Sequence, residues 1–316
     1  MSNPALNFVA AGIGCNAFTL LDRTKIIDKL ITKQKINRNS INKKHYKNPA
    51  AIIMALVTLE KLNVLKRQGN YFLLTLFGNR LVHYRGLITM LFEGYGDLLS
   101  HQIKIQNGAL THIQRLINGE SIALSSIQFG EEKIDPLVLS RIKKYKIKNT
   151  ICDLGCGTGE KLIKIVKSSK LKALGIEYNN KAIKVAKSKV KRIKNITIVK
   201  GDITKLEKVW YDVELLTQFF VMHDFTPTKK CLKILNSLLK VFPNVQYFFY
   251  VDIVSPSQTK DSIMPGFDYV HGLQGIVPRT YEETIKMFNV SKFQLIEEIP
   301  IKTMPNTFFW ILAPNK

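Results

Sequence analysis

Hydrophobic residues in the C-terminal part of the chain form short uninterrupted runs that alternate with segments of helical periodicity. The uninterrupted runs, which we predict to be strands, cover residues 148–154, 171–177, 196–202, 213–222 and 245–254. The segments with apolar residues at every third or fourth position, which we predict to be helices, cover residues 160–169, 180–193, 226–242 and 279–290. Strands that alternate with helices of this length form right-handed crossovers, so the pattern predicts a parallel sheet in an α/β fold.

The pattern changes at the end of the chain. Residues 293–301 and 307–314 are two further predicted strands with only a short turn between them. A connection this short joins antiparallel strands, because a parallel pair needs a long crossover. We therefore expect a mostly parallel sheet that is closed by an antiparallel last strand.

Residues 1–120 lack this alternation and are mostly helical in pattern. Two predicted helices, residues 24–34 and 49–65, are followed by a turn at 66–70 and a strand-like run at 71–75. Helix, turn, helix and hairpin in this order predict a winged-helix-like domain. The second helix is strongly apolar, whereas a helix that reads DNA needs an exposed polar face, so we favour packing or dimerisation for this domain.

These patterns predict three regions. Residues 1–83 form a helical, winged-helix-like dimerisation domain, residues 84–135 a helical linker or lid, and residues 136–316 the domain with the sheet. An apolar helical domain at the N-terminus makes a homodimer the expected state.

Composition limits the classes of protein to which the chain can belong. The chain has 316 residues, of which 46% are hydrophobic. Its four cysteines show no CxxC spacing, so neither a zinc ribbon nor a disulfide framework is indicated. No window approaches 18 consecutive apolar residues, and no basic region precedes the mildly apolar N-terminus. We therefore predict a cytoplasmic protein without a membrane span, a membrane partner or a signal peptide.

The formal net charge of +23 raises the question of a nucleic-acid partner. The lysines are scattered through helices such as residues 180–193 and do not gather in one stripe with arginines and aromatic residues. Scattered charge reports solubility and compositional bias better than it reports a specific site. We expect a small-molecule substrate and no nucleic acid.

A glycine-rich loop, TICDLGCGTGEKL at residues 150–162, lies between the first predicted strand of the sheet and the next helix. Gly155, Gly157 and Gly159 can adopt positive φ angles and let a ligand approach the backbone. This is the edge of an α/β sheet where ligands bind. Three acidic residues also lie at strand ends: Asp153, Glu177 and Asp202.

The series DLGCGTG, GIE and GD resembles the S-adenosylmethionine site of class I methyltransferases, which have a Rossmann-like sheet with an antiparallel last strand. The resemblance implies that Glu177 binds the ribose hydroxyls and Asp202 the adenine amine, and that Asp153 lies near the cationic sulfonium. Gln218, beside the end of the fourth strand, is expected to line the cofactor pocket. A dinucleotide site would instead need G-x-G-x-x-G.

His223 and Asp224 follow the fourth predicted strand, at the ligand edge of the sheet. This segment resembles the small-molecule O-methyltransferases of secondary metabolism that carry an N-terminal winged-helix dimerisation domain. The resemblance implies that the His-Asp pair supplies a general base, with His223 as the base. No N/D-P-P-Y motif follows this strand, which argues against methylation of a base amine and leaves a nucleic-acid methyltransferase as the third alternative.

His271 adds a second histidine, in a predicted loop after the fifth strand. Together His223, Asp224 and His271 resemble the ligands of metal-dependent C-methyltransferases of 2-oxo acids, which implies a divalent metal or ferric iron. Such a metal would hold the carboxylate and enolate oxygen of the substrate, so that the β-carbon loses a proton and attacks the methyl group. Arg279 is expected to hold the substrate carboxylate. We favour this reaction and keep metal-free O-methylation as the alternative.

Overall fold

The computed structural model describes residues 4–130, 133–255, 266–302, 304 and 306–315. The chain divides into two compact units. The N-terminal unit comprises Met1–Asp97 and Leu124–Phe129, and the C-terminal unit comprises Leu98–Ala123 and Gly130–Lys316. The predicted borders after residues 83 and 135 stay predictions.

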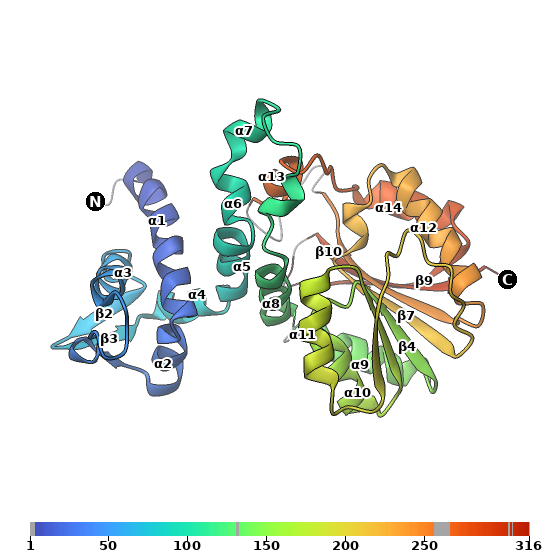
Figure 1. The fold of residues 1–316 in the computed structure, drawn as a ribbon, viewed down its shortest axis with the longest axis horizontal. Helices are drawn as coiled ribbons and strands as arrows, with labels where there is room; N and C mark the ends of the chain where they lie inside the picture. Colours follow the sequence, from blue (N-terminus) through green and yellow to red (C-terminus); the bar gives the residue numbers. More distant parts are fainter. Residues whose placement is uncertain (1–3, 131–132, 256–265, 303, 305, 316) are drawn as a thin grey trace. The chain divides into compact units, whose positions relative to one another are not determined.

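The C-terminal unit contains a seven-stranded sheet of order β6-β5-β4-β7-β8-β10-β9 (Figure 1). Its strands are β4 (Thr150–Leu154), β5 (Ala173–Glu177), β6 (Ile196–Lys200), β7 (Val213–Phe219), β8 (Tyr247–Ile253), β9 (Phe293–Pro300) and β10 (Thr307–Pro314). All neighbours are parallel except β10, which is antiparallel to both β8 and β9. The predicted mostly parallel sheet with an antiparallel last strand is confirmed.

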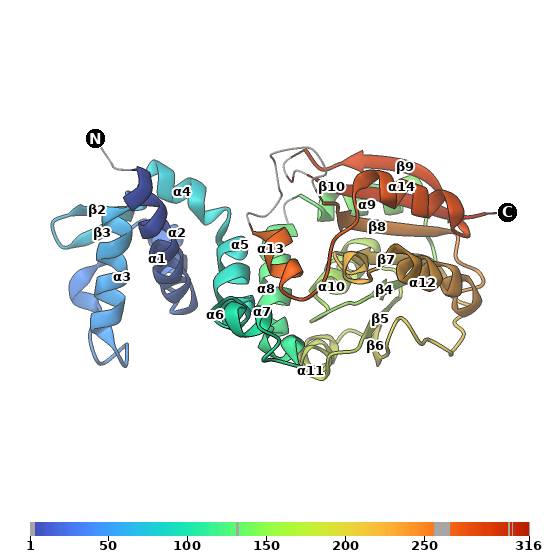
Figure 2. The ribbon, with the colours of Figure 1, turned by 90° about the horizontal axis from the view of Figure 1, so that it is seen from above.

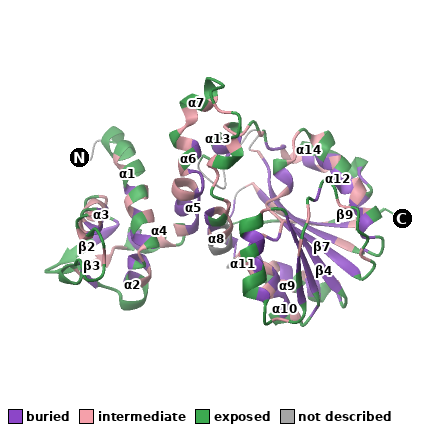
Figure 3. Ribbon diagram, in the orientation of Figure 1, coloured by how far each residue is buried: buried purple, intermediate pink, exposed green. Residues whose placement is uncertain are grey.

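Helices pack against this sheet and, apart from the consecutive α13 and α14, are separated along the chain by its strands (Figure 2). They are α9 (Asp135–Lys144), α10 (Glu160–Ser169), α11 (Asn180–Val190), α12 (Thr228–Val241), α13 (Phe267–Gly272) and α14 (Tyr281–Val290). Apolar residues of α12 and α14 pack with β4, β7, β8 and β10 in one cluster, while α10 and α11 pack with β5 and β6 in another. Strands β4, β5, β7, β8 and β10 are consequently buried along most of their length (Figure 3).

The N-terminal unit contains helices and one small antiparallel sheet of order β1-β3-β2. Its elements are α1 (Pro4–Arg23), α2 (Ile26–Lys33), β1 (Ile36–Asn37), α3 (Pro49–Lys61), β2 (Leu65–Gln68), β3 (Tyr71–Leu74), α4 (Leu76–Val82) and α5 (Arg85–Thr89). The predicted helix over 49–65 ends early, because Asn63 adopts a left-handed conformation with φ 59° and β2 begins two residues later. The winged-helix assignment stays a prediction.

Several short helices follow α5 along the chain. They are the π-helical turn Met90–Gly94, α6 (Gly96–Ser100), α7 (Gln102–Gln106), the 3-10 turn Ile113–Leu116 and α8 (Gly119–Gly130). The helical linker predicted over 84–135 therefore consists of several short pieces.

Helix α1 is an exception to the prediction that no segment could span a membrane. Among the described residues it is long and apolar enough to do so by length and composition, with 17% of its most apolar window buried. This is weak evidence for a span, because core helices and signal sequences have the same properties.

The Glu297 carboxylate ties β9 to the end of α9. Its Oε1 lies 2.8 Å from Nη2 of Arg141, and its Oε2 accepts hydrogen bonds of 2.8 Å from Lys144 Nζ and Tyr145 Oη. Burial alone would raise the pKa of Glu297, but these three donors outweigh it and lower the pKa to about 2.

We predict that Glu297→Gln lowers the free energy of unfolding by about 1 kcal/mol at pH 7, because the donors lose a charged acceptor. The folded-state pKa lies below the ordinary value of about 4.3, so this stabilisation is present above that pH and disappears as the pH falls toward 2. Denaturant unfolding from pH 7 to pH 2 measures it. The exposed Glu282→Gln is the control for the loss of one charge; equal effects of the two substitutions at pH 7 would contradict the prediction.

Candidate active site

Parallel strands β4, β5, β7 and β8 end at one edge of the sheet, and most of the predicted site residues follow these ends. β4 leads into the glycine-rich loop, and β7 into a turn at residues 220–225. β5 and β7 lie on opposite sides of β4, so the order in which strands are added to the sheet reverses there. Such a point opens a crevice for ligands in α/β folds.

The glycine-rich loop has the backbone that the sequence predicted. Gly155, Gly157 and Gly159 adopt φ angles of 75°, 54° and 82°. A Cβ on Gly155 would lie 2.8 Å from Cγ2 of Val221 in the turn after β7, so this position also requires close approach. Positive φ and the missing side chains bring the loop against its neighbour and leave its backbone accessible.

Glu177 fastens this loop to the end of β5. Its Oε2 accepts a 2.9 Å hydrogen bond from the backbone N–H of Gly157, and its Oε1 accepts bonds from the N–H groups of Tyr178 and Asn179. A carboxylate has about four acceptor sites, so ribose hydroxyls can bond to it as well. The predicted ribose contact remains a prediction.

Asp153 and Asp202 lie in contrasting environments. Asp153 is buried and accepts a 2.7 Å hydrogen bond from the hydroxyl of Thr217. Burial raises the pKa of Asp153 to about 7, against the opposing effects of Thr217 and of the Lys161 charge. Asp202 is exposed and accepts hydrogen bonds from the N–H and hydroxyl of Thr204, which lower its pKa. A nearby cation would favour the ionised form of Asp153.

Gln218 bonds to several protein groups. Its side chain is fully buried, and Nε2 donates to the carbonyl of Val251 at 3.1 Å and to Asp252 Oδ2 at 3.3 Å. Its Oε1 accepts a 3.0 Å bond from the N–H of Val221. Since protein groups already use its amide, Gln218 supports the turn beside the glycine loop, and its contribution to a cofactor pocket stays a prediction.

His223, Asp224 and His271 come together at this edge. His223 and Asp224 lie in a 3-10 turn, Met222–Asp224, just after β7. His271 lies on the short helix α13 and not in a loop, because α13 begins after Gly266, which has φ 80°. One potential ligand atom from each of the three residues lies within 4.8 Å of the other two. Oδ1 of Asp224 is 3.4 Å from Nε2 of His223 and 3.7 Å from Nε2 of His271.

The opposite nitrogen of each imidazole is held by the protein. Nδ1 of His223 lies 2.6 Å from Oδ1 of Asp252, and Nδ1 of His271 lies 2.7 Å from the carbonyl oxygen of Phe267. A carbonyl oxygen only accepts, so Nδ1 of His271 carries the proton and Nε2 of the neutral ring is the basic nitrogen. Protein metal sites commonly orient their histidines in this way.

The two histidines differ in basicity. Burial and the neighbouring His223 lower the pKa of His271 to about 4, so its ring is neutral at pH 7. Burial also acts to lower the pKa of His223, but the charges of Asp252 and Asp224 outweigh it and raise the pKa.

Asp252 is a functional residue that the sequence interpretation missed. It is buried near the end of β8, and its Oδ1 accepts a hydrogen bond from the N–H of Ile253 as well as the one from His223. Its Oδ2 accepts from the backbone N–H of His223 and from Gln218. The available signal was a single carboxylate within the apolar run of residues 247–254, because a buried charge needs partners.

Arg279 also bonds to protein groups. Its Nη1 donates to the carbonyl of Phe225 at 2.9 Å and its Nη2 to the carbonyl of Met222 at 2.5 Å. Only 4% of the residue is exposed. Both terminal nitrogens are thus bonded to backbone carbonyls, and a contact of the guanidinium with a substrate carboxylate stays a prediction.

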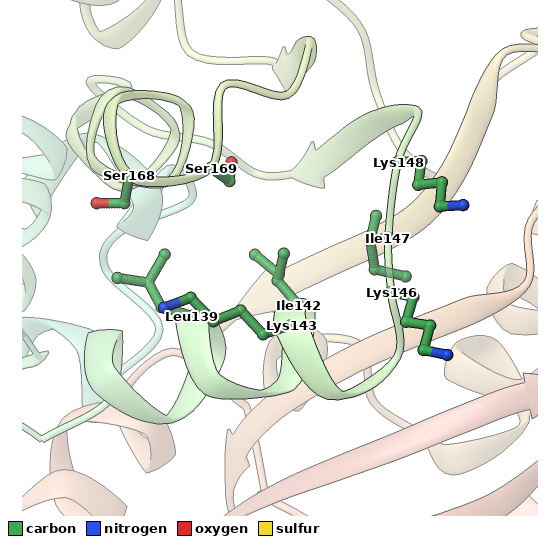
Figure 4. Close-up of a pocket in the computed structure, with 8 residues that line it drawn as sticks. All are labelled: Leu139, Ile142, Lys143, Lys146, Ile147, Lys148, Ser168 and Ser169. Carbon is green, nitrogen blue, oxygen red and sulfur yellow. The ribbon is translucent and has the colours of Figure 1, made fainter.

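A separate pocket of about 400 Å³ lies between the C-terminal half of α9, the segment before β4 and the end of α10 (Figure 4). Its lining includes Leu139, Ile142 and Ile147, with lysine side chains around them. None of the predicted site residues lines this pocket, which lies where β4 begins and not where it ends.

Known proteins resemble the chain in sequence. Residues 146–275 match the family described as a methyltransferase domain. An indolepyruvate C-methyltransferase from Streptomyces griseus is 28% identical over 307 residues, which cover 95% of this chain and 92% of that protein.

Solved structures share the fold over nearly the whole chain. The mitomycin 7-O-methyltransferase MmcR matches with a TM-score of 0.73 and 11% identity, over 99% of this chain and 97% of that chain. The complex of PigF with SAH matches with a TM-score of 0.69 and 14% identity, over 100% of both chains. Likeness at such low identity shows the fold. The matching methyltransferase domain and the methyltransferase relative identify the chain as an S-adenosylmethionine-dependent methyltransferase, and the solved structures show that it has the class I fold.

Proposed function

We propose that the chain methylates the β-carbon of a 2-oxo acid, with His223, Asp224 and His271 as the ligands of a divalent metal or ferric iron. The observation that carries the proposal is the convergence of one ring nitrogen from each histidine and one carboxylate oxygen within 4.8 Å. The indolepyruvate C-methyltransferase relative supports a 2-oxo acid as the substrate class.

The donor set fits such a metal. Two neutral imidazoles and one carboxylate bind first-row transition metals, and three protein ligands leave positions for a substrate. When bound, the metal supplies Lewis-acid stabilisation of negative charge on the substrate oxygens. Asp252 and the carbonyl of Phe267 each hold one Nδ1 and so direct both Nε2 atoms toward Asp224.

The cofactor contacts belong to the same proposal. Glu177 would accept hydrogen bonds from the ribose hydroxyls, and Asp202 would accept a hydrogen bond from the adenine amine. Asp153 would lie on the side of the cationic methionine portion, where a positive charge offsets the cost of ionising a buried carboxyl. The backbone of Gly155, Gly157 and Gly159 would allow the close approach that these contacts need.

Metal-free O-methylation is the second candidate, and one observation favours it. The 2.6 Å hydrogen bond to Asp252 makes His223 a stronger base, as a general base for a substrate hydroxyl requires. In that reaction His271 would have no ligand role, so the two histidines discriminate between the candidates.

Metal analysis of the purified protein tests the first candidate. We predict stoichiometric metal in the wild type and a loss of at least about tenfold in metal affinity in His223→Ala and in His271→Ala, because each removes one of three ligands. Activity should fall in both variants. His112→Ala, at an exposed histidine elsewhere in the unit, should change neither property. Wild type that takes up no metal, with activity lost only in His223→Ala, would replace C-methylation by general-base O-methylation.

We also propose a cytoplasmic homodimer that forms through the N-terminal unit. Apolar side chains are exposed along α1 at Leu6, Phe8, Val9 and Ile13, and Phe8 is 84% exposed. Exposed apolar surface of this kind marks an interaction site.

The double substitution Phe8→Asp and Ile13→Asp should convert the dimer to a monomer in light scattering, because it places charges in the apolar contact. Leu76→Asp on α4 is the control, since that side chain is also exposed in the same unit. A monomeric wild type that binds lipid vesicles through α1 would contradict the dimer and indicate a membrane contact.

A further inference from the structure

We propose that Arg279 is a positioning residue, which holds the turn that carries His223 and Asp224 and acts on the reaction through these two residues. The assignment of a metal to the turn rests on the proposed function. How the turn is held does not, since it follows from contacts within the C-terminal unit.

The guanidinium spans the part of the turn that carries the two candidate ligands. Nη2 bonds to the carbonyl of Met222, directly before His223, and Nη1 bonds to the carbonyl of Phe225, directly after Asp224. The two candidate ligands therefore lie between two backbone groups that one rigid, planar side chain fixes at a set separation. A lysine ammonium is a point charge without this fork and does not reproduce the arrangement.

The turn has little to hold it from within. The hydrogen bonds between its own backbone groups are long: 3.3 Å from Asp224 N–H to the Val221 carbonyl, and 3.2 Å from Phe225 N–H to the Met222 carbonyl. Phe220, where the turn begins, has a φ of 58°, which is an unfavourable conformation for a bulky residue. The shape of the turn consequently depends on partners outside it.

Those partners are the carbonyl of Val251, which accepts a 2.9 Å bond from the N–H of Phe220, and three buried polar side chains. Gln218 accepts from the N–H of Val221, Asp252 accepts from the N–H of His223, and Arg279 donates to the two carbonyls. Of these three side chains, Arg279 contacts the backbone both before and after the pair His223 and Asp224.

Arg279 is itself held in place. Its own carbonyl accepts a 2.8 Å bond from the N–H of Ser255, just after β8. The next residue, Thr280, begins α14 with a capping box formed with Glu283. Arg279 thus connects the turn to β8 and α14. It forms no ion pair with a carboxylate in the part of the chain that the structure describes, so its charge is satisfied mainly by the turn it holds.

The test uses Arg279→Met and Arg279→Lys, with Arg141→Met as the control. Arg141 is a partly buried arginine of the C-terminal unit that bonds to Glu297 instead of the turn. One readout needs no metal: the proton NMR signal of Nδ1–H of His223, which a 2.6 Å bond to a carboxylate shifts downfield and which His223→Gln identifies by its loss. The others are the affinities of metal-stripped protein for Co²⁺ and for S-adenosylmethionine.

We expect both Arg279 variants to lose or broaden the His223 signal and to bind Co²⁺ at least about tenfold more weakly, as substitutions beside metal ligands do. Their affinity for S-adenosylmethionine should change less than about twofold, since the glycine loop keeps its other contacts. Arg141→Met should keep the signal and both affinities. If wild type and control bind no Co²⁺, the proposed metal function fails and the NMR signal still decides the role of Arg279.

Two results would overturn the inference. An unchanged His223 signal with a raised KM for substrate would make Arg279 a substrate contact. A parallel loss of the signal, of cofactor affinity and of thermal stability in both variants would make it a general structural residue.

Discussion

Asp252 is a buried carboxylate near the end of β8. A buried carboxylate must have its acceptor positions satisfied by hydrogen-bond donors. Two of its hydrogen bonds go to one residue, to the backbone N–H and the ring of His223, and a third comes from Gln218. Gln218 in turn holds Val221, which lies against the position of Gly155. A single buried charge therefore links the histidine cluster to the glycine loop.

The parallel sheet makes this network possible, because β4, β7 and β8 all end at one edge. Packing of α12 and α14 against these strands keeps the edge rigid, and a site on rigid elements holds its side chains more accurately than one on loops alone. The cofactor residues lie on the β4–β5 side and the histidines on the β7–β8 side. A methyl donor and a methyl acceptor bound on these two sides would meet over β4.

The strands, most helices and the glycine loop could be predicted from the sequence because each depends on a local pattern. Hydrophobic periodicity placed α10 at its observed bounds, and the spacing of Gly155, Gly157 and Gly159 indicated their positive φ angles. Asp252 and the contacts of Gln218 and Arg279 depend on which strand ends become neighbours, and sequence spacing does not report that. His271 was expected in a loop because its helix has only six residues, too few to show a period.

The position to which the methyl group is transferred tests the proposed C-methylation most directly. The protein would be incubated with S-adenosylmethionine carrying a ¹³C-labelled methyl group and with an aryl-substituted 2-oxo acid such as indolepyruvate, and the product examined by carbon NMR. C-methylation at the β-carbon should give a labelled methyl on carbon that couples to the proton of the adjacent β-carbon. A labelled methyl on oxygen, or transfer only to hydroxylated acceptors, would contradict it.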